Sequence, residues 1–243
     1  QTVESYGNDL NEKSDLGDIF DSIENIDEIL RVRFLTSYPV DMTDKIIHAI
    51  ANSQKVCNHF LIPVQSGSDE MLLRMRRGYS ISEFYERVTF IKKIIPNAAI
   101  STDIIVGFPD ESEEEFQDTI KLIKDVEFDK IHIAAYSPRP GTYAYRKLED
   151  NIPLEIKKER LQIVEAVQKD IALKKNSKLV NATVDVLVEK EENGRCSGRT
   201  QNNQLVHFNG NQVIGKIVKV KIFEISPWSL KGVMSNSEEL AVL

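Results

Sequence analysis

The sequence contains little cysteine and a single tryptophan. Its 243 residues include 2 cysteines, Cys57 and Cys196, which lie far apart along the chain. Two distant cysteines form neither a disulfide framework nor a local metal-binding motif, so a reduced, cytoplasmic setting is expected. Apolar runs that approach the roughly 20 residues of a membrane span are missing, and the first residues do not have the pattern of a signal peptide. No membrane partner is therefore expected.

Positive charge is also scarce. The formal net charge is −7, which argues against a broadly basic surface of the kind that grips nucleic acid. Residues 1–30 account for this excess, because they hold nine acidic residues and Lys13 as their only basic residue. The remainder of the chain is close to neutral. Contact with RNA would therefore need a local cluster of cations.

The first two thirds of the chain have the pattern of a parallel α/β sheet. Apolar runs rich in β-branched residues alternate with amphipathic segments between residues 15 and 136, which favours βα units. Strands are expected at residues 32–37, 60–65, 98–107 and 130–136. Helices are expected at residues 16–30, 43–52, 80–95 and 112–126. Ser112 and Glu115 match a capping box at the start of the last of these helices.

The pattern changes in the last third. A charged helix is expected from about residue 153 to 175, and short strands follow at residues 182–189, 195–200, 205–208, 217–225 and 229–234. Asn-Gly turns at 193–194 and 209–210 are typical of hairpins. Five short strands in about 55 residues predict a small antiparallel barrel. We expect two domains, at residues 1–175 and 176–243.

Polar or glycine-containing segments follow each of the four expected strands of the first domain. In parallel α/β folds the chemistry gathers at the carboxyl ends of the strands. Each segment alone is consistent with a purely conformational role, since turns favour Gly, Ser, Pro and Asp. The segments that follow the strands are LTSYP at 35–39, PVQSGSD at 63–69, IVGFP at 105–109 and YSPRPGT at 136–142.

Together with MRRGY at 75–79, these runs resemble the radical S-adenosylmethionine methylthiotransferases. Residues 180–234 resemble the TRAM domain, an RNA-binding barrel that ends those enzymes. The segments TSYP and YSPRPGT are most similar to those of the branch of the family that methylthiolates C2 of N6-isopentenyladenosine beside the tRNA anticodon. The resemblance implies an α/β fold, namely the last four βα units of a partial radical SAM (β/α)6 open barrel, followed by a small antiparallel TRAM barrel.

The resemblance implies that S-adenosyl-L-methionine binds at the strand tips. The implied cofactor-binding residues are Gln1, Gln65, Ser66, Asp103, Val106, Tyr136 and Ser137. Arg139 is placed to meet a sulfur-transfer intermediate or a tRNA phosphate. An apolar floor with donors and acceptors around it suits a charged cofactor. Purely structural roles, such as a buried turn for Asp103 and a surface ion pair for Arg139, stay open.

The TRAM-like segment offers its own candidates for contact with the anticodon stem-loop of tRNA. Cations would contact phosphates, and aromatic side chains would stack on unpaired bases. We expect Phe208 and Phe223 to lie in the barrel core and His207 to lie on the surface. For Trp228 the sequence is consistent with either a buried or an exposed side chain. The candidate RNA-binding residues are Arg195, Arg199, Lys219, Lys221, Trp228 and Lys231.

The sequence departs from the family in its cysteines. The family binds two 4Fe-4S clusters, each through three cysteine thiolates, and Cys57 and Cys196 cannot supply three ligands to either. Both are expected to be buried apolar side chains. No metal-binding residue is therefore assigned, and the chain is expected to be the C-terminal part of a longer enzyme and inactive alone.

Two alternatives to isopentenyladenosine chemistry stay open. Relatives within the family act on threonylcarbamoyl-adenosine in tRNA or on an aspartate of a ribosomal protein. A non-catalytic RNA-binding protein that kept the fold and lost the clusters is the alternative from another class. No residue pattern identifies the sulfur donor or the oligomeric state.

Overall fold

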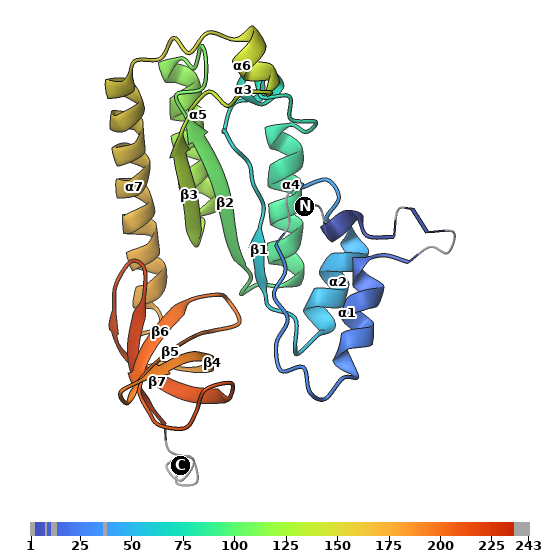
Figure 1. The fold of residues 1–243 in the computed structure, drawn as a ribbon, viewed down its shortest axis with the longest axis vertical. Coiled ribbons are helices and arrows are strands. Elements are labelled where there is room, and N and C mark those ends of the chain that lie inside the picture. The colour runs from blue at the N-terminus through green and yellow to red at the C-terminus, as the bar shows by residue number, and fades with distance from the viewer. Residues whose placement is uncertain (1–2, 8, 11–13, 36–37, 236–243) are drawn as a thin grey trace.

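A computed structural model describes residues 3–7, 9–10, 14–35 and 38–235. A parallel sheet with helices on one side occupies the upper part of the molecule, and a small closed barrel lies below it (Figure 1). A long helix, α7 (Leu154–Ser177), runs from the top of the sheet down to the barrel. No helix within the described ranges is long and apolar enough to cross a membrane.

The sheet has three parallel strands in the order β1 (His59–Leu61), β2 (Ala99–Val106) and β3 (Lys130–Ala135). Helix α4 (Ile81–Ile94) connects β1 to β2, and α5 (Glu113–Val126) connects β2 to β3. Each of these helices begins with a capping box, in which a serine and a glutamate three residues later satisfy each other's backbone amides. The box expected at Ser112 is confirmed. The α/β fold class is confirmed as well.

The strand expected at residues 32–37 is present only as an isolated β-bridge. Val32 pairs in parallel with Val56, its amide donating to the Lys55 carbonyl and its carbonyl accepting from the Cys57 amide. Phe34 then packs its ring against Phe60, with centroids 5.6 Å apart. Because only Val32 finds a backbone partner among the described residues, no ladder forms there. Residues 36–37 of this prediction lie outside the described residues.

Several helices differ from the expected bounds. Helix α1 (Leu16–Glu24) ends six residues before the predicted residue 30. The Glu24 carboxylate accepts hydrogen bonds from the Ser53 hydroxyl and the Gln54 amide, which ties the end of α1 to the end of α2. The elements with bounds not given so far are α2 (Asp44–Asn52) and the unexpected η1 (Val3–Ser5), α3 (Asp69–Arg74) and α6 (Tyr143–Lys147).

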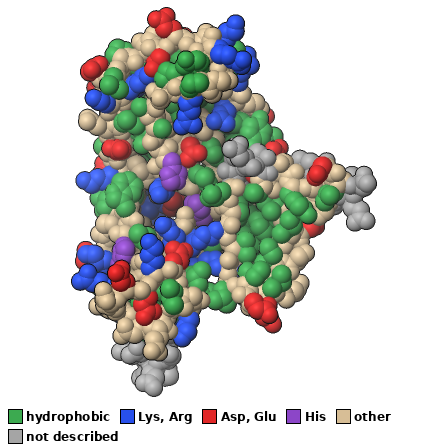
Figure 2. Space-filling model, in the orientation of Figure 1, with side chains coloured by type: hydrophobic (Ala, Val, Ile, Leu, Met, Phe, Trp, Pro, Cys, Tyr) green, Lys and Arg blue, Asp and Glu red, His purple; other side chains and the backbone are tan. Residues whose placement is uncertain are grey.

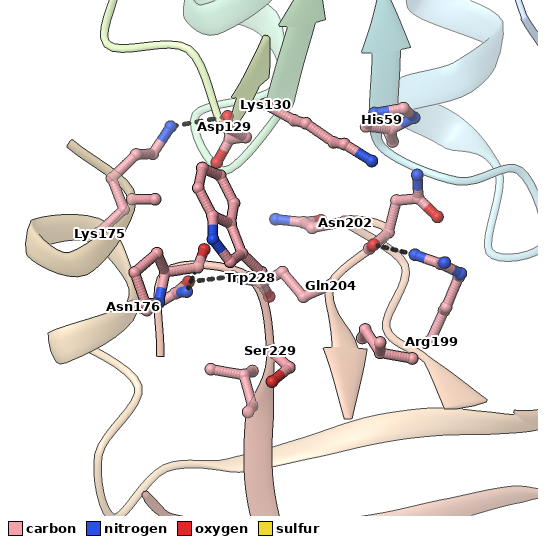
Figure 3. Close-up of a pocket in the computed structure, with 15 residues that line it drawn as sticks. His59, Asp129, Lys130, Lys175, Asn176, Arg199, Asn202, Gln204, Trp228 and Ser229 are labelled. Atoms are coloured by element: carbon pink, nitrogen blue, oxygen red, sulfur yellow. Dashed lines mark hydrogen bonds and ion pairs between the residues drawn. The ribbon is translucent and has the colours of Figure 1, made fainter. Parts of the chain in front are cut away.

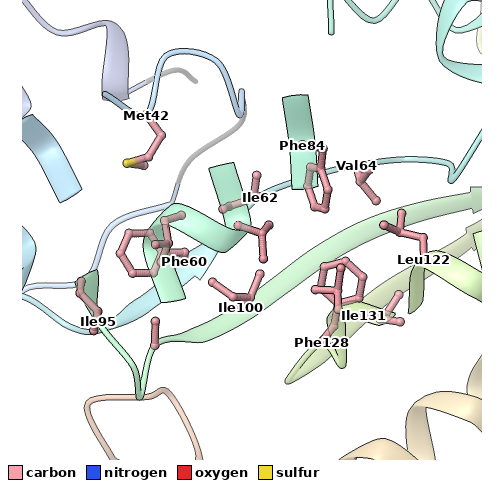
Figure 4. Packing of buried hydrophobic residues seen from close by; sticks show 14 of the residues in the cluster. Met42, Phe60, Ile62, Val64, Phe84, Ile95, Ile100, Leu122, Phe128 and Ile131 are labelled. Atoms are coloured by element: carbon pink, nitrogen blue, oxygen red, sulfur yellow. The ribbon is translucent and has the colours of Figure 1, made fainter. Parts of the chain in front are cut away.

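The core lies between the sheet and its helices. Alternate residues of β2 face this core, including Ile104 and Val106, which are fully buried. Figure 4 shows Phe60, Phe84 and Phe128 packed among aliphatic side chains of the strands and helices. The other residues of β2, including Asp103 and Ile105, therefore lie on the opposite face of the sheet, which is where the site is built.

The second domain is a closed barrel with the strand order β4-β5-β6-β8-β7. Its strands are β4 (Thr183–Glu192), β5 (Arg195–Arg199), β6 (Leu205–Asn209), β7 (Ile217–Ile225) and β8 (Leu230–Met234). Four of the pairings are antiparallel, but β6 and β8 pair in parallel. The predicted small barrel is confirmed, and it is antiparallel except for this pairing of β6 with β8. Closure leaves no free sheet edge.

The two aromatic residues expected in the barrel core differ. Phe208 is buried as predicted, whereas Phe223 is 56% exposed. The register between β7 and β8 shifts between Ile222 and Glu224. Up to Ile222 the strand alternates, with Val220 and Ile222 buried and Lys219 and Lys221 exposed, so Phe223 falls on the outer face by this alternation, and the shift leaves Glu224 exposed as well. The prediction for Phe223 is therefore wrong.

Polar contacts join the barrel to the sheet domain. Arg31 donates to the Arg199 carbonyl over 2.6 Å, and Arg33 donates to the Asn203 side-chain oxygen over 3.0 Å. Asn202 donates to the Asn97 carbonyl over 2.7 Å. The loop after β5 is therefore held beneath the amino ends of the sheet strands.

Candidate functional site

A cavity of about 330 Å³ lies at the carboxyl ends of β2 and β3, and Figure 1 shows these strand ends pointing toward the top of the molecule. Three predicted residues, Tyr136, Ser137 and Arg139, line it together. Ile105 and Ala134 supply an apolar wall from the open face of the sheet. The cavity thus combines the apolar surface and the polar rim that a ligand site needs.

Gln65 lies four residues after the end of β1, where it forms an isolated parallel β-bridge with Ile104 of β2. Its amide donates to the Asp103 carbonyl and its carbonyl accepts from the Ile105 amide, at 2.9 and 3.0 Å. Its φ is 72°, in the left-handed region that non-glycine residues rarely occupy. Such conformations cost free energy and cluster at functional sites. The Gln65 side-chain amide makes no hydrogen bond to the described residues, so it is available to a ligand.

Ser66 is fully buried, and its hydroxyl lies 3.2 Å from the Thr119 hydroxyl. The amide of Gly67 also donates to Thr119, over 2.9 Å. Gly67 packs so closely on α5 that an added Cβ would lie 2.5 Å from the Asp118 carbonyl oxygen. The structure therefore shows Ser66 fastening the loop to α5. Its contact with a cofactor stays a prediction.

Asp103 lies on the open face of the sheet, in register with His132 of β3. Burial raises the pKa of its carboxyl group, while the positive charges of His132 and Arg77 oppose that rise. Within the described residues the carboxylate makes no hydrogen bond or ion pair. A partly buried acceptor without a partner is suited to a ligand that carries an amine or another positive group.

Tyr136 packs edge-to-face on Phe108, with ring centroids 4.9 Å apart. The Tyr136 amide donates to the Val106 carbonyl over 2.8 Å, whereas the Val106 side chain is in the core. Any contact of Val106 with a ligand would thus be through its backbone. Lys157 of α7 donates to the Tyr136 carbonyl over 3.2 Å. Burial raises the pKa of the Tyr136 hydroxyl.

Sequence reasoning missed the ion pair that supports the turn after β2. Glu111 accepts a hydrogen bond from the Gly107 amide over 2.6 Å, and Arg160 of α7 lies 2.5 Å from the same carboxylate oxygen. Both side chains are buried. Burial raises the pKa of the Glu111 carboxyl group, and the Gly107 amide and Arg160 oppose that rise. The partners are distant in sequence, so no local pattern could have paired them.

A second missed feature is a stacked pair at the rim of the cavity. The guanidinium carbon of Arg76 lies 3.4 Å from the ring centroid of Tyr143, and both residues line the cavity with Arg139. The MRRGY run contains Arg76, but no separate role was predicted for this residue. The pair places a cation and an aromatic face at the entrance.

The predicted RNA-binding residues do not form one cluster. Arg199 and Trp228 line a pocket between the barrel and the sheet. Arg195 is at the other end of β5, and Lys219 and Lys221 are exposed on β7. The ammonium of Lys231 is 2.7 Å from the Glu224 carboxylate, so it forms a surface ion pair. His207 is exposed as expected. Gln1 lies outside the described residues.

The two cysteines do not fit an iron-sulfur cluster. Cys57 lies just before β1 and Cys196 lies in the barrel, and both are buried and free. Burial raises the pKa of both thiols, which disfavours the thiolate form that binds iron. In the part of the chain that the structure describes, no group of three His, Cys, Asp or Glu side chains could hold a metal ion.

Comparison with known families agrees with this architecture. The model of the radical SAM superfamily matches residues 2–123, and that of the TRAM domain matches residues 177–234. The chain belongs to the radical SAM superfamily. A solved structure of coproporphyrinogen III oxidase from Escherichia coli, a radical SAM enzyme, aligns over 70% of this chain and 46% of its own with a TM-score of 0.50. At 13% identity this likeness concerns the fold alone.

Curated relatives are similar over nearly the whole chain. The tRNA-2-methylthio-N(6)-dimethylallyladenosine synthase of Dehalococcoides mccartyi (strain CBDB1) is 45% identical over 97% of this chain and 57% of its own. The synthase of the same name from Thermosipho melanesiensis is 43% identical over 96% of this chain and 54% of its own. The chain thus spans about half the length of the curated relatives that it matches.

Proposed function

We propose that this chain is part of a tRNA methylthiotransferase that adds a methylthio group to C2 of N6-isopentenyladenosine beside the anticodon. The observation that carries this proposal is the identity of 41–45% to synthases of that product, which extends through both domains. A relative that shared only the radical SAM fold would not match across the TRAM domain as well. The proposed domains are residues 1–175 and 176–243.

S-adenosyl-L-methionine would be held at the carboxyl ends of the strands, by Gln65, Asp103, Tyr136 and Ser137. The carboxylate of Asp103, which has no hydrogen-bond or ion-pair partner among the described residues, fits the amine or sulfonium of this cofactor, and the Phe108–Tyr136 pair fits a flat adenine. When bound, the cofactor supplies the radical that starts the reaction. The chain's own residues orient it and keep water from it. Ser66, in the loop after β1, and the backbone of Val106, at the end of β2, remain part of the proposed pocket, and Gln1, which lies outside the described residues, stays a proposed cofactor-binding residue.

Cys57 and Cys196 take no part in cluster binding under this proposal. The two 4Fe-4S clusters of the proposed full-length enzyme would need thiolates other than these two. Arg139, which is exposed at the rim of the cavity, would meet a tRNA phosphate or a sulfur-transfer intermediate.

The RNA partner would be the anticodon stem-loop of a tRNA, contacted by the barrel and the cavity rim. Exposed cations on the barrel and the Arg76–Tyr143 pair support this proposal, because phosphates and unpaired bases are recognised by such groups. Action on tRNA would place the protein in the cytoplasm.

Mass analysis of tRNA nucleosides tests this function. We expect cells that lack the gene to contain isopentenyladenosine without its methylthio group, and the wild-type gene to restore the group. Persistence of methylthio-isopentenyladenosine, with loss of the methylthio form of threonylcarbamoyl-adenosine instead, would contradict the proposed target.

A further inference from the structure

A pocket of about 180 Å³ lies between the barrel and the amino ends of the sheet strands (Figure 3). His59 and Lys130 come from the starts of β1 and β3, and Trp228 comes from the turn between β7 and β8. Lys130 lines this pocket and Ala134 of the same strand lines the cavity at the carboxyl ends, so at about 3.3 Å per residue the two positions are roughly 13 Å apart, and the two sites share no lining residue. The two are therefore different sites.

A buried amide holds the turn that presents Trp228. Asn176, at the end of α7, is 8% exposed and donates to the Ser226 carbonyl over 2.8 Å. Its own side-chain oxygen accepts from Gln204, over 3.2 Å. The turn is thus tied to both α7 and the loop after β5. The position of the indole is fixed by the fold.

Trp228 is open to solvent on more than one side. It is 57% exposed, and its indole N–H makes no hydrogen bond to the described residues. The same side chain also lines a second hollow of about 540 Å³, with Ile131 and Ile133 of β3. Trp228 therefore separates two adjoining hollows. An exposed indole of this kind is a surface on which nucleic-acid bases stack.

The charged side chains that line the pocket are mostly cations, namely Lys130, Lys175 and Arg199, of which Arg199 also lies 3.6 Å from the Glu189 carboxylate. The pocket's one lining acid, Asp129, is already paired with Lys175 at 2.6 Å. The ammonium of Lys130 has no hydrogen bond or ion pair within the described residues. Burial lowers the pKa of His59 to about 4, and the nearby charges of Arg199 and Lys130 add to that effect. Figure 2 shows Lys, Arg and His side chains gathered at this junction.

We propose that this pocket binds one unpaired nucleotide of an RNA, with the base stacked on Trp228 and a phosphate contacted by Lys130 and Arg199. The inference rests on the proposed function for its RNA partner. A volume of about 180 Å³ is below the roughly 300 Å³ at which pockets begin to enclose a free small ligand. A ligand held here would therefore need further contacts outside the pocket, as one nucleotide of a longer RNA has. It would not be the nucleotide that reacts, because the proposed reaction site lies at the other end of the strands.

The test uses the single tryptophan as its probe. The chain is titrated with a tRNA anticodon stem-loop hairpin and, separately, with AMP, while tryptophan emission is followed. We expect the hairpin to quench the emission and AMP to bind far more weakly. Trp228→Leu should weaken hairpin binding about 5- to 100-fold, measured by anisotropy of a labelled hairpin, and Trp228→Phe should retain most of it.

Lys130→Gln should weaken binding and lower the slope of log affinity against log salt by about 1. Phe223→Leu is the matched aromatic control, since Phe223 is equally exposed on the outer face of β7, and Lys121→Gln on α5 is the matched charge control. Both controls should bind as the wild type does.

Unchanged hairpin affinity in Trp228→Leu would overturn the inference while leaving RNA binding elsewhere intact. AMP binding as tight as the hairpin would also overturn it, in favour of a free-nucleotide site. Absence of hairpin binding by the wild type would overturn it too, and the tRNA nucleoside analysis then decides separately whether the proposed function fails.

Discussion

Arg160 of α7 and Glu111 form a buried ion pair beneath the turn that ends β2, with Nη1 and Oε2 2.5 Å apart. The same carboxylate oxygen accepts a hydrogen bond from the Gly107 amide, so the pair links the long helix to the rim of the cavity at the carboxyl ends of the strands. A charge buried without its partner is costly, which makes this contact a test of how the rim is held.

Arg160→Met should lower the free energy of unfolding by about 3–5 kcal/mol, because Glu111 is left buried and unpaired. Urea unfolding measures this. Lys174→Met, which breaks the exposed Lys174–Glu127 pair, is the control and should cost at most about 1 kcal/mol. An equal loss of unfolding free energy in the two variants would show that the buried ion pair stabilises the fold no more than the exposed pair does.

Gly107→Ala should destabilise the turn by about 1–3 kcal/mol. Gly107 has a φ of +67°, and an added Cβ would lie 2.4 Å from Cγ of Lys157. Gly141→Ala is a matched control, since Gly141 has a φ of +89° with nothing within 4 Å. It should show only the smaller conformational cost of about 1 kcal/mol. If the two unfolding curves shift equally, the close approach of Gly107 to Lys157 does not add to the cost of the alanine substitution.

The strand tips were predictable because their chemistry is local. The segments that contain Gln65 and Tyr136 were predicted from the residues that directly follow each apolar run. The capping box at Ser112 depends only on the residues from 112 to 115. The outward position of Phe223 was predictable too, because Phe223 continues the row of exposed Lys219 and Lys221 that alternates with buried Val220 and Ile222 in β7.

The contacts between residues far apart in the sequence, in contrast, could not be predicted. Arg31 and the Arg199 carbonyl are 168 positions apart, and Arg160 and Glu111 are 49 apart. Neither pair leaves a periodic pattern. Trp228 could be noticed as the only tryptophan, but its two neighbouring hollows arise only when α7, β3 and the barrel are brought together.

Stability should fall in acid partly because of His59. Its pKa is about 4 in the folded state against 6.5 ordinarily, so the folded state favours the neutral ring. This contribution is complete above about pH 6.5 and is lost as the pH falls toward 4, amounting to about 2–3 kcal/mol. His59→Gln should reduce the difference between unfolding free energies at pH 7 and pH 4.5. His207→Gln, at an exposed histidine of the barrel that does not contribute to the pKa of His59, should not; a loss of pH dependence in both variants alike would refute the assignment to His59.

Asp103→Asn should weaken binding of S-adenosyl-L-methionine to the whole protein about 10- to 100-fold, as expected for loss of a hydrogen bond to a charged group. Calorimetric titration measures the affinity. Asp125→Asn, at a carboxylate that contacts Tyr85 on the helical surface, is the control. Unchanged cofactor affinity in Asp103→Asn would remove this carboxylate from the cofactor site.

The most direct test of the central claim is turnover by the whole protein that contains this chain. It is incubated without oxygen, with S-adenosyl-L-methionine, a reductant and a sulfide source, on tRNA that carries either isopentenyladenosine or threonylcarbamoyl-adenosine, and the nucleosides are analysed by mass. The account predicts a methylthio group on isopentenyladenosine alone. A methylthio group on threonylcarbamoyl-adenosine alone would contradict it.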